Sequence, residues 1–166
     1  MTASHAAAYE PVFTGSVLAK LEALYPRYPD KRSLLLPTLW LVQEARGWIP
    51  EDAVREVAEK LDLTAAYVRG VVTFYTMYHT HPVGRHFIQV CTTSPCGMCG
   101  SEEVARALVE HTGCGDLGAT SPDGRFTVIE VECLGACGFV TPILIDEDFI
   151  ESVTPETVPA ILARYS

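Results

Sequence analysis

The chain has 166 residues, of which 48% are hydrophobic and 20% are charged, which is typical of water-soluble proteins. Its 21 acidic residues outnumber its 12 basic residues, and the resulting net charge of -9 would repel a nucleic-acid backbone. No stretch approaches the roughly 20 apolar residues that a membrane-spanning helix needs, and the N-terminus lacks the order of a secretory signal. We therefore expect a cytoplasmic protein that neither inserts into a membrane nor binds nucleic acid.

The N-terminal half predicts a lead-in followed by a helical module. Residues 1–13 are rich in alanine and lack an apolar period, so we expect a flexible segment. Apolar residues at helical spacing then predict four short helices between residues 14 and 83. We expect Gly47 to end the second helix in a left-handed conformation and Thr64 to cap the fourth. The four helices are expected at residues 14–25, 33–46, 50–61 and 64–78, and the second is expected to bury Trp40.

After Gly84 the sequence changes to short apolar runs that are rich in β-branched residues. These runs predict strands at residues 87–90, 126–131, 143–145 and 149–151, with one helix capped by Ser101 and another starting at Thr154. The order of strands and helices favours a thioredoxin-like layer for residues 84–166. The predicted fold class is therefore α+β, with an N-terminal four-helix module followed by a thioredoxin-like domain.

Four of the six cysteines follow predicted strands in two pairs. Cys91 and Cys96 form C-x4-C after the first strand, and Cys133 and Cys137 form C-x3-C after the second. A reducing compartment disfavours disulfides, and loops at strand ends can aim several thiolates at one point. A [2Fe–2S] cluster needs two thiolates on each iron, so we expect each loop to supply the two ligands of one iron.

A structural zinc site is one alternative, because zinc also takes four thiolates. Most zinc sites use C-x2-C spacing, which neither pair shows. A thiol-disulfide oxidoreductase is the second alternative, since Cys96 and Cys99 form a C-x-x-C between a strand and a helix. That mechanism leaves Cys91, Cys133 and Cys137 without a role. Cys99 could also replace Cys96 as a ligand.

Three further features suggest no separate activity. Residues 52–75 superficially resemble a helix-turn-helix, but the would-be recognition helix offers only Arg69 near its start. Cys114 lies between two glycines at a predicted helix end and is assigned no role. No glycine-rich phosphate loop follows a strand, so we expect this chain to bind neither NAD nor a flavin by itself.

Read together, several motifs resemble the E subunit family of bacterial NADH:quinone oxidoreductase, respiratory complex I. The resemblance covers nearly all the chain after the lead-in. Its most specific parts are VCTTSPC at residues 90–96, PDG at 122–124 and VECLGAC at 131–137. The sequence departs from the family pattern at Cys99 and at Thr141, where members usually carry no further thiol and a small alanine, respectively.

The resemblance implies a thioredoxin-like [2Fe–2S] ferredoxin domain with one cluster on Cys91, Cys96, Cys133 and Cys137. In that family the cluster exchanges electrons with the FMN of an NADH-oxidising partner subunit, which binds FMN and NADH itself. Other iron-sulfur subunits complete a hydrophilic arm on the cytoplasmic side of the inner membrane. The module is also similar to diaphorase subunits of NAD-linked hydrogenases and formate dehydrogenases, so either holoenzyme fits the sequence.

Overall fold

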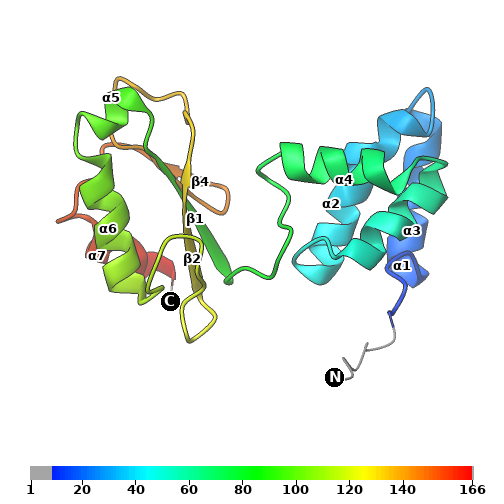
Figure 1. Ribbon diagram of the computed structural model, residues 1–166, viewed down its shortest axis with the longest axis horizontal. Coiled ribbons are helices and arrows are strands. Elements are labelled where there is room, and N and C mark those ends of the chain that lie inside the picture. The colour runs from blue at the N-terminus through cyan, green and yellow to red at the C-terminus, as the bar shows by residue number, and fades with distance from the viewer. Residues whose placement is uncertain (1–8, 166) are drawn as a thin grey trace, which may run out of the picture. The chain divides into compact units, whose positions relative to one another are not determined.

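A computed structural model describes residues 9–165. The chain divides into two compact units between Pro82 and Val83 (Figure 1). The first unit is helical, and the second combines helices with a four-stranded sheet, so the fold is α+β. Among residues 9–165 every helix is too short or too polar to traverse a bilayer.

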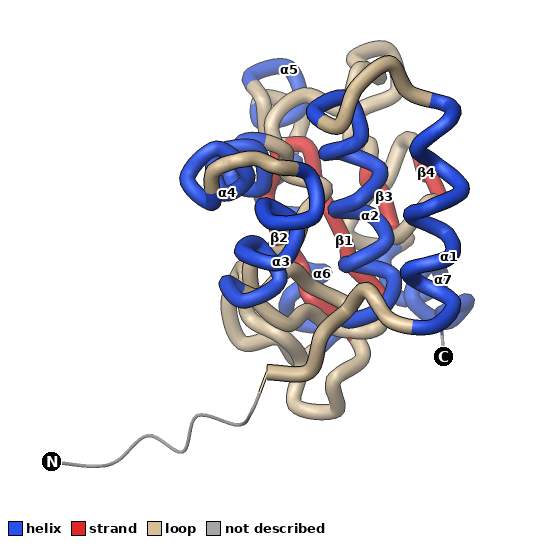
Figure 2. Tube along the Cα trace, turned by 90° about the vertical axis from the view of Figure 1, so that its right-hand side faces the viewer, coloured by secondary structure: helices blue, strands red, loops and turns tan. Residues whose placement is uncertain are grey.

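Four α-helices build the described part of the first unit. They are α1 Gly15–Leu24, α2 Leu35–Arg46, α3 Glu51–Leu61 and α4 Ala65–Phe74, and short 3-10 turns span Tyr25–Arg27 and Arg32–Leu34. Helix α1 packs beside α2, α2 beside α3, and α3 beside α4 (Figure 2). The two expected end signals are present, because Gly47 ends α2 with φ 79° and Thr64 Oγ1 accepts a hydrogen bond from Tyr67 N at 3.2 Å.

Three expectations for this unit need correction. Residues 1–8 of the expected lead-in lie outside the described residues, but Val12 and Phe13 are buried in the helical core. The Glu56 carboxylate accepts hydrogen bonds from both of their backbone amides, which is why this segment is fixed. Helix α4 ends at Phe74 instead of reaching Tyr78. Trp40, expected in the core, is 42% exposed.

The second unit contains one sheet with the strand order β2-β1-β3-β4. Strand β1 runs parallel to β2 and antiparallel to β3, and β3 and β4 form a hairpin. The strands are β1 His86–Cys91, β2 Phe126–Val131, β3 Ile143–Ile145 and β4 Asp148–Ile150. The helices are α5 Ser94–Gly97, α6 Ser101–Thr112 and α7 Val158–Leu162, followed by a 3-10 turn at Ala163–Tyr165.

Helices α6 and α7 lie on the same face of the sheet (Figure 1). Burial of aliphatic side chains between these layers is the main stabilising contribution. The central side chains that no solvent reaches are Ile88, Val90, Leu108, Val128, Ile143 and Ile145. This core holds the ends of β1 and β2 in fixed positions, which matters because the cysteine loops begin there.

Two helix starts in the second unit differ from expectation. Gly100, with φ 93°, occupies the N-cap of α6, and Ser101 is the first helical residue with its side chain fully buried. Only glycine adopts that left-handed conformation without strain. The N-cap of α6 therefore lies one residue before Ser101, which the sequence predicted as the cap. The last helix begins at Val158, because Thr154 to Thr157 form a turn closed by Thr157 N to Thr154 O at 3.0 Å.

Candidate metal centre

The two cysteine loops leave the sheet at the same end because β1 and β2 are parallel neighbours. Cys91 is the last residue of β1, and Cys133 follows the end of β2 by two positions. The loop after β2, drawn in gold, reaches the end of the sheet where α5 lies (Figure 1). Thr92 N donates to Val131 O at 3.3 Å and extends the pairing of the two strands into the loops.

The first pair of thiols is buried. Cys91 and Cys96 are each 1% exposed. The short helix α5 turns the chain back after β1, and it is closed by a hydrogen bond from Gly97 N to Thr93 O at 2.9 Å. This turn brings the thiol of Cys96 within hydrogen-bonding reach of the thiol of Cys91.

The second pair lies at the surface in the loop after β2. Cys133 and Cys137 are exposed, and their thiols are within hydrogen-bonding reach of each other. Gly135 has φ 84°, a conformation that favours glycine, and its backbone amide donates to Cys133 Sγ at 3.3 Å. The tight turn between the two cysteines therefore also supplies a donor to a sulfur.

The two pairs interact with each other. The backbone amide of Leu134, in the second loop, reaches the sulfur of Cys91 in the first. Burial raises the pKa of the Cys96 thiol to about 11, with further contributions from Cys91, Cys137 and Cys133 in that order. Repulsion by Cys133 raises the pKa of the Cys137 thiol. Thiols of the two loops therefore lie close enough to interact electrostatically.

Cys91 has the most donors of the four. Burial, the largest single effect, raises the pKa of its thiol, but hydrogen bonds outweigh burial and the net pKa is lowered. The donors are the backbone amides of Leu134 and Thr93 and the thiol of Cys96, and the Thr93 hydroxyl lies nearby. Such donors stabilise a thiolate, which is the form of cysteine that binds metal.

The arrangement of donors fits a binuclear cluster. Within residues 9–165 no group of three or more cysteine, histidine or acidic side chains surrounds a single point closely enough to hold one ion. The thiols come as two pairs, which matches the two thiolates that each iron of a [2Fe–2S] core requires. The buried Thr93 hydroxyl beside Cys91 has no well-formed hydrogen bond, so it is a spare donor at this site.

The family model for the thioredoxin-like [2Fe–2S] ferredoxin matches residues 21–166. The chain belongs to this family. The resemblance drawn from the sequence motifs is confirmed, and so is the thioredoxin-like ferredoxin fold. The family match covers both pairs of cysteines.

Relatives of this ferredoxin include E subunits of NADH-quinone oxidoreductase. The chain is 40% identical over 150 residues to the E subunit of NADH-quinone oxidoreductase from Rickettsia bellii, covering 89% of each chain. It is 40% identical over 138 residues to the E subunit of the same enzyme from Pseudomonas aeruginosa, covering 83% of this chain and 82% of that one.

A solved structure shares the fold over most of the chain. It is the NAD+-reducing [NiFe]-hydrogenase in the air-oxidized state, with a TM-score of 0.66 and 19% sequence identity. The match covers 80% of this chain but only 22% of the hydrogenase chain. This likeness concerns the fold alone.

The remaining two cysteines differ in their surroundings. Cys99 is exposed just after α5, and its backbone amide donates to Cys96 O at 2.9 Å. Cys114 is buried away from the loops, where Thr112 donates to its sulfur at 3.1 Å and the thiol donates to Phe126 O at 3.4 Å. Cys114 is therefore a core residue of this ferredoxin domain.

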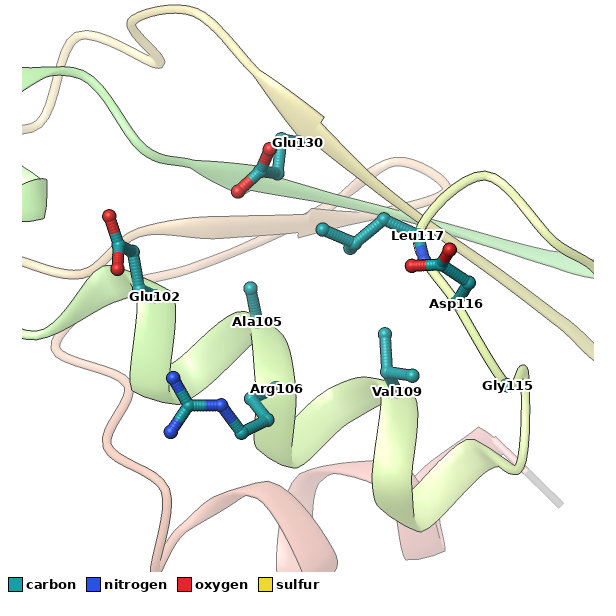
Figure 3. Close-up of a pocket in the computed structure, with 8 residues that line it drawn as sticks. All are labelled: Glu102, Ala105, Arg106, Val109, Gly115, Asp116, Leu117 and Glu130. Carbon is teal, nitrogen blue, oxygen red and sulfur yellow. The ribbon is translucent and has the colours of Figure 1, made fainter.

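Sequence reasoning missed the noncysteine donors, Thr93 and Leu134. Each lies inside a cysteine motif, and that position was the available signal. A separate groove of about 370 Å³ between α6 and β2 contains no cysteine (Figure 3). Its lining residues are Glu102, Ala105, Arg106, Val109, Gly115, Asp116, Leu117 and Glu130.

Proposed function

We propose that this chain is an electron-transfer subunit that holds one [2Fe–2S] cluster on Cys91, Cys96, Cys133 and Cys137. The observation that carries the proposal is the contact between the two cysteine loops, in which the Leu134 amide reaches Cys91. This contact supports the proposal that two pairs of thiols, distant in sequence, serve one cluster. When bound, such a cluster accepts and returns one electron at a time.

The residues of the chain hold and tune the site. The four thiolates would bind the irons, and Gly135 N and Leu134 N would supply hydrogen bonds to the ligand sulfurs. Burial of the first pair keeps water from one side of the site, whereas the exposed second pair leaves the other side accessible. An electron carrier needs this asymmetry, because its partner must come close to the cluster.

The partners follow from the relatives. Two relatives that match most of the chain are named as the E subunit of NADH-quinone oxidoreductase. We infer that this chain likewise docks on a flavin-bearing, NADH-oxidising subunit, which binds FMN and NADH, and works beside other iron-sulfur subunits. The complex would lie on the cytoplasmic side of the inner membrane, with this chain attached peripherally.

We also propose a division of labour along the chain. Residues 84–166 contain all six cysteines and would form the cluster domain. Residues 14–83 would form a separate helical module, which the division between Pro82 and Val83 supports. Because no cysteine lies in the helical module, its role would be attachment rather than electron transfer.

Isolation of the assembled complex through a tag on this chain tests the proposed function. We expect membrane-associated subunits to copurify, and we expect NADH to reduce a binuclear cluster that electron paramagnetic resonance detects. Copurification with a soluble hydrogen-oxidising or formate-oxidising subunit would instead assign the chain to a diaphorase module. Disulfide reduction by an iron-free chain through Cys96 and Cys99 would contradict the electron-carrier proposal.

A further inference from the structure

Thr93 occupies a helix N-cap without using its side chain there. It precedes α5 with φ -61° and ψ 155°, the extended conformation of an N-cap residue, yet its hydroxyl forms no capping hydrogen bond. An N-cap threonine ordinarily accepts a hydrogen bond from one of the first amides of its helix. Thr64, at the start of α4, does so. The Thr93 hydroxyl therefore does not cap α5.

The groups around the Thr93 hydroxyl indicate a different role. Thr93 Oγ1 is buried and has no well-formed hydrogen bond among the described residues. A buried polar group without a partner destabilises the folded state, so its presence calls for an explanation. The same side chain lies within reach of Cys91 Sγ, and Thr93 also directs its backbone amide to that sulfur.

Two other buried hydroxyls, those of Ser101 and Thr141, also lack partners among the described residues. Neither is among the groups that hydrogen-bond to the thiols of Cys91, Cys96 or Cys137. Thr93 combines both properties, because it is an unpartnered buried donor and a neighbour of a proposed ligand. The geometry therefore singles out this residue.

We propose that Thr93 is a positioning residue whose hydroxyl donates to the Cys91 thiolate and raises the reduction potential of the cluster. The inference rests on the proposed function, since it concerns a ligand of the same site. Reduction adds one negative charge, and a donor at a ligand sulfur stabilises that charge more in the reduced state than in the oxidised state. The hydroxyl would thereby favour electron uptake.

Redox titration of the full chain, followed by electron paramagnetic resonance, tests this role. Thr93→Val removes the hydroxyl at nearly constant shape, and we expect its midpoint potential to shift to a more negative value. Thr93→Ser retains the donor and is expected to restore the wild-type potential. Thr112→Val is the matched control, because Thr112 is also buried in the second unit but bonds to Leu108 O at 2.7 Å and to Cys114.

The outcomes separate this inference from the proposed function. A more negative potential in Thr93→Val, with wild-type values in Thr93→Ser and Thr112→Val, supports the role of the hydroxyl. An unchanged potential in Thr93→Val with full iron content overturns it while leaving the electron-carrier proposal intact. If Thr93→Val does not assemble a cluster, Thr93→Ala replaces it under the same criterion. Absence of iron from the wild-type chain contradicts the proposed function itself.

Discussion

The backbone amide of Leu134 lies within hydrogen-bonding reach of the sulfur of Cys91 and so connects the two cysteine loops. Leu134 directly follows Cys133, so this contact also places Cys133 near the first loop. The sheet makes the contact possible, because parallel β1 and β2 end side by side.

Replacing individual cysteines distinguishes ligands from bystanders. We expect Cys137→Ser to lower the metal affinity of the site because a ligand is lost. The drop should exceed the roughly 10-fold to 100-fold change that is typical when only a residue hydrogen-bonded to a ligand is replaced. Cys114→Ala is the control and should retain its iron, because Cys114 is buried with other partners. Iron content and visible absorbance measure the result. A cluster lost in Cys99→Ser but kept in Cys96→Ser would make Cys99 the ligand.

Much of the architecture around these cysteines is readable from local sequence. Strand β2 falls where the β-branched run predicts it, and Gly47 and Thr64 bound helices as their chemistry requires. The contact of Leu134 with Cys91 is not readable in this way, because it depends on how two distant loops meet. The burial of Ser101 could not be predicted for a similar reason. Its residue type is typical of a helix cap, but tertiary packing covers its side chain.

Gly84 supports the start of β2, and enlarging it should destabilise the second unit. A Cβ added at Gly84 would lie 2.5 Å from the backbone carbonyl carbon of Phe126, which cannot move aside as a flexible side chain could. We expect Gly84→Ala to lower the free energy of unfolding by about 1 to 3 kcal/mol. Loss of visible circular dichroism from the cluster on heating reports on this unit.

Gly70→Ala is the matched control for that substitution. Gly70 lies inside α4, and a Cβ there would meet no atom within 4 Å. Alanine in a helix interior is better than glycine by about 0.5 to 1 kcal/mol, so the first unit of this variant should be slightly more stable by tryptophan fluorescence, while its cluster signal should be lost at the wild-type temperature. Equal stability of Gly84→Ala and the wild type would show that Phe126 does not restrict this position.

Glu56 fixes the chain before α1. Its carboxylate accepts hydrogen bonds from Val12 N at 2.8 Å, from Phe13 N at 3.1 Å and from the Tyr9 hydroxyl. We expect Glu56→Ala to cost about 2 kcal/mol, since hydrogen bonds to a charged group are among the stronger ones. Hydrogen exchange should then accelerate at residues 12 and 13. Glu56→Gln, which retains an acceptor, should show a smaller effect, and equal exchange in all three proteins would refute the contact.

Tyr78 should make the helical unit sensitive to alkaline pH. The residue is 4% exposed, and its hydroxyl donates to Leu36 O at 2.9 Å. Burial, followed by repulsion from Tyr75, raises the pKa of Tyr78 from 10.0 to about 12. Below pH 10 both the folded and unfolded states keep the proton. Between pH 10 and 12 the unfolded state releases it first, so the stability that the raised pKa provides is lost as pH rises.

Tyr78→Phe tests this assignment. We expect a loss of about 1 kcal/mol at neutral pH from the missing hydrogen bond, together with a weaker decline in stability between pH 10 and 12. Both tryptophans, Trp40 and Trp48, lie in the first unit, so their fluorescence during denaturation follows that unit alone. If the stability of Tyr78→Phe falls between pH 10 and 12 as steeply as that of the wild type, another group is responsible for the alkaline sensitivity.

Electron paramagnetic resonance of the dithionite-reduced full chain, combined with metal analysis, tests the central claim most directly. The two adjacent thiol pairs predict a binuclear iron-sulfur signal and equal amounts of iron and acid-labile sulfide. A colourless protein that contains zinc and no iron, and that gives no signal on reduction, would contradict the account.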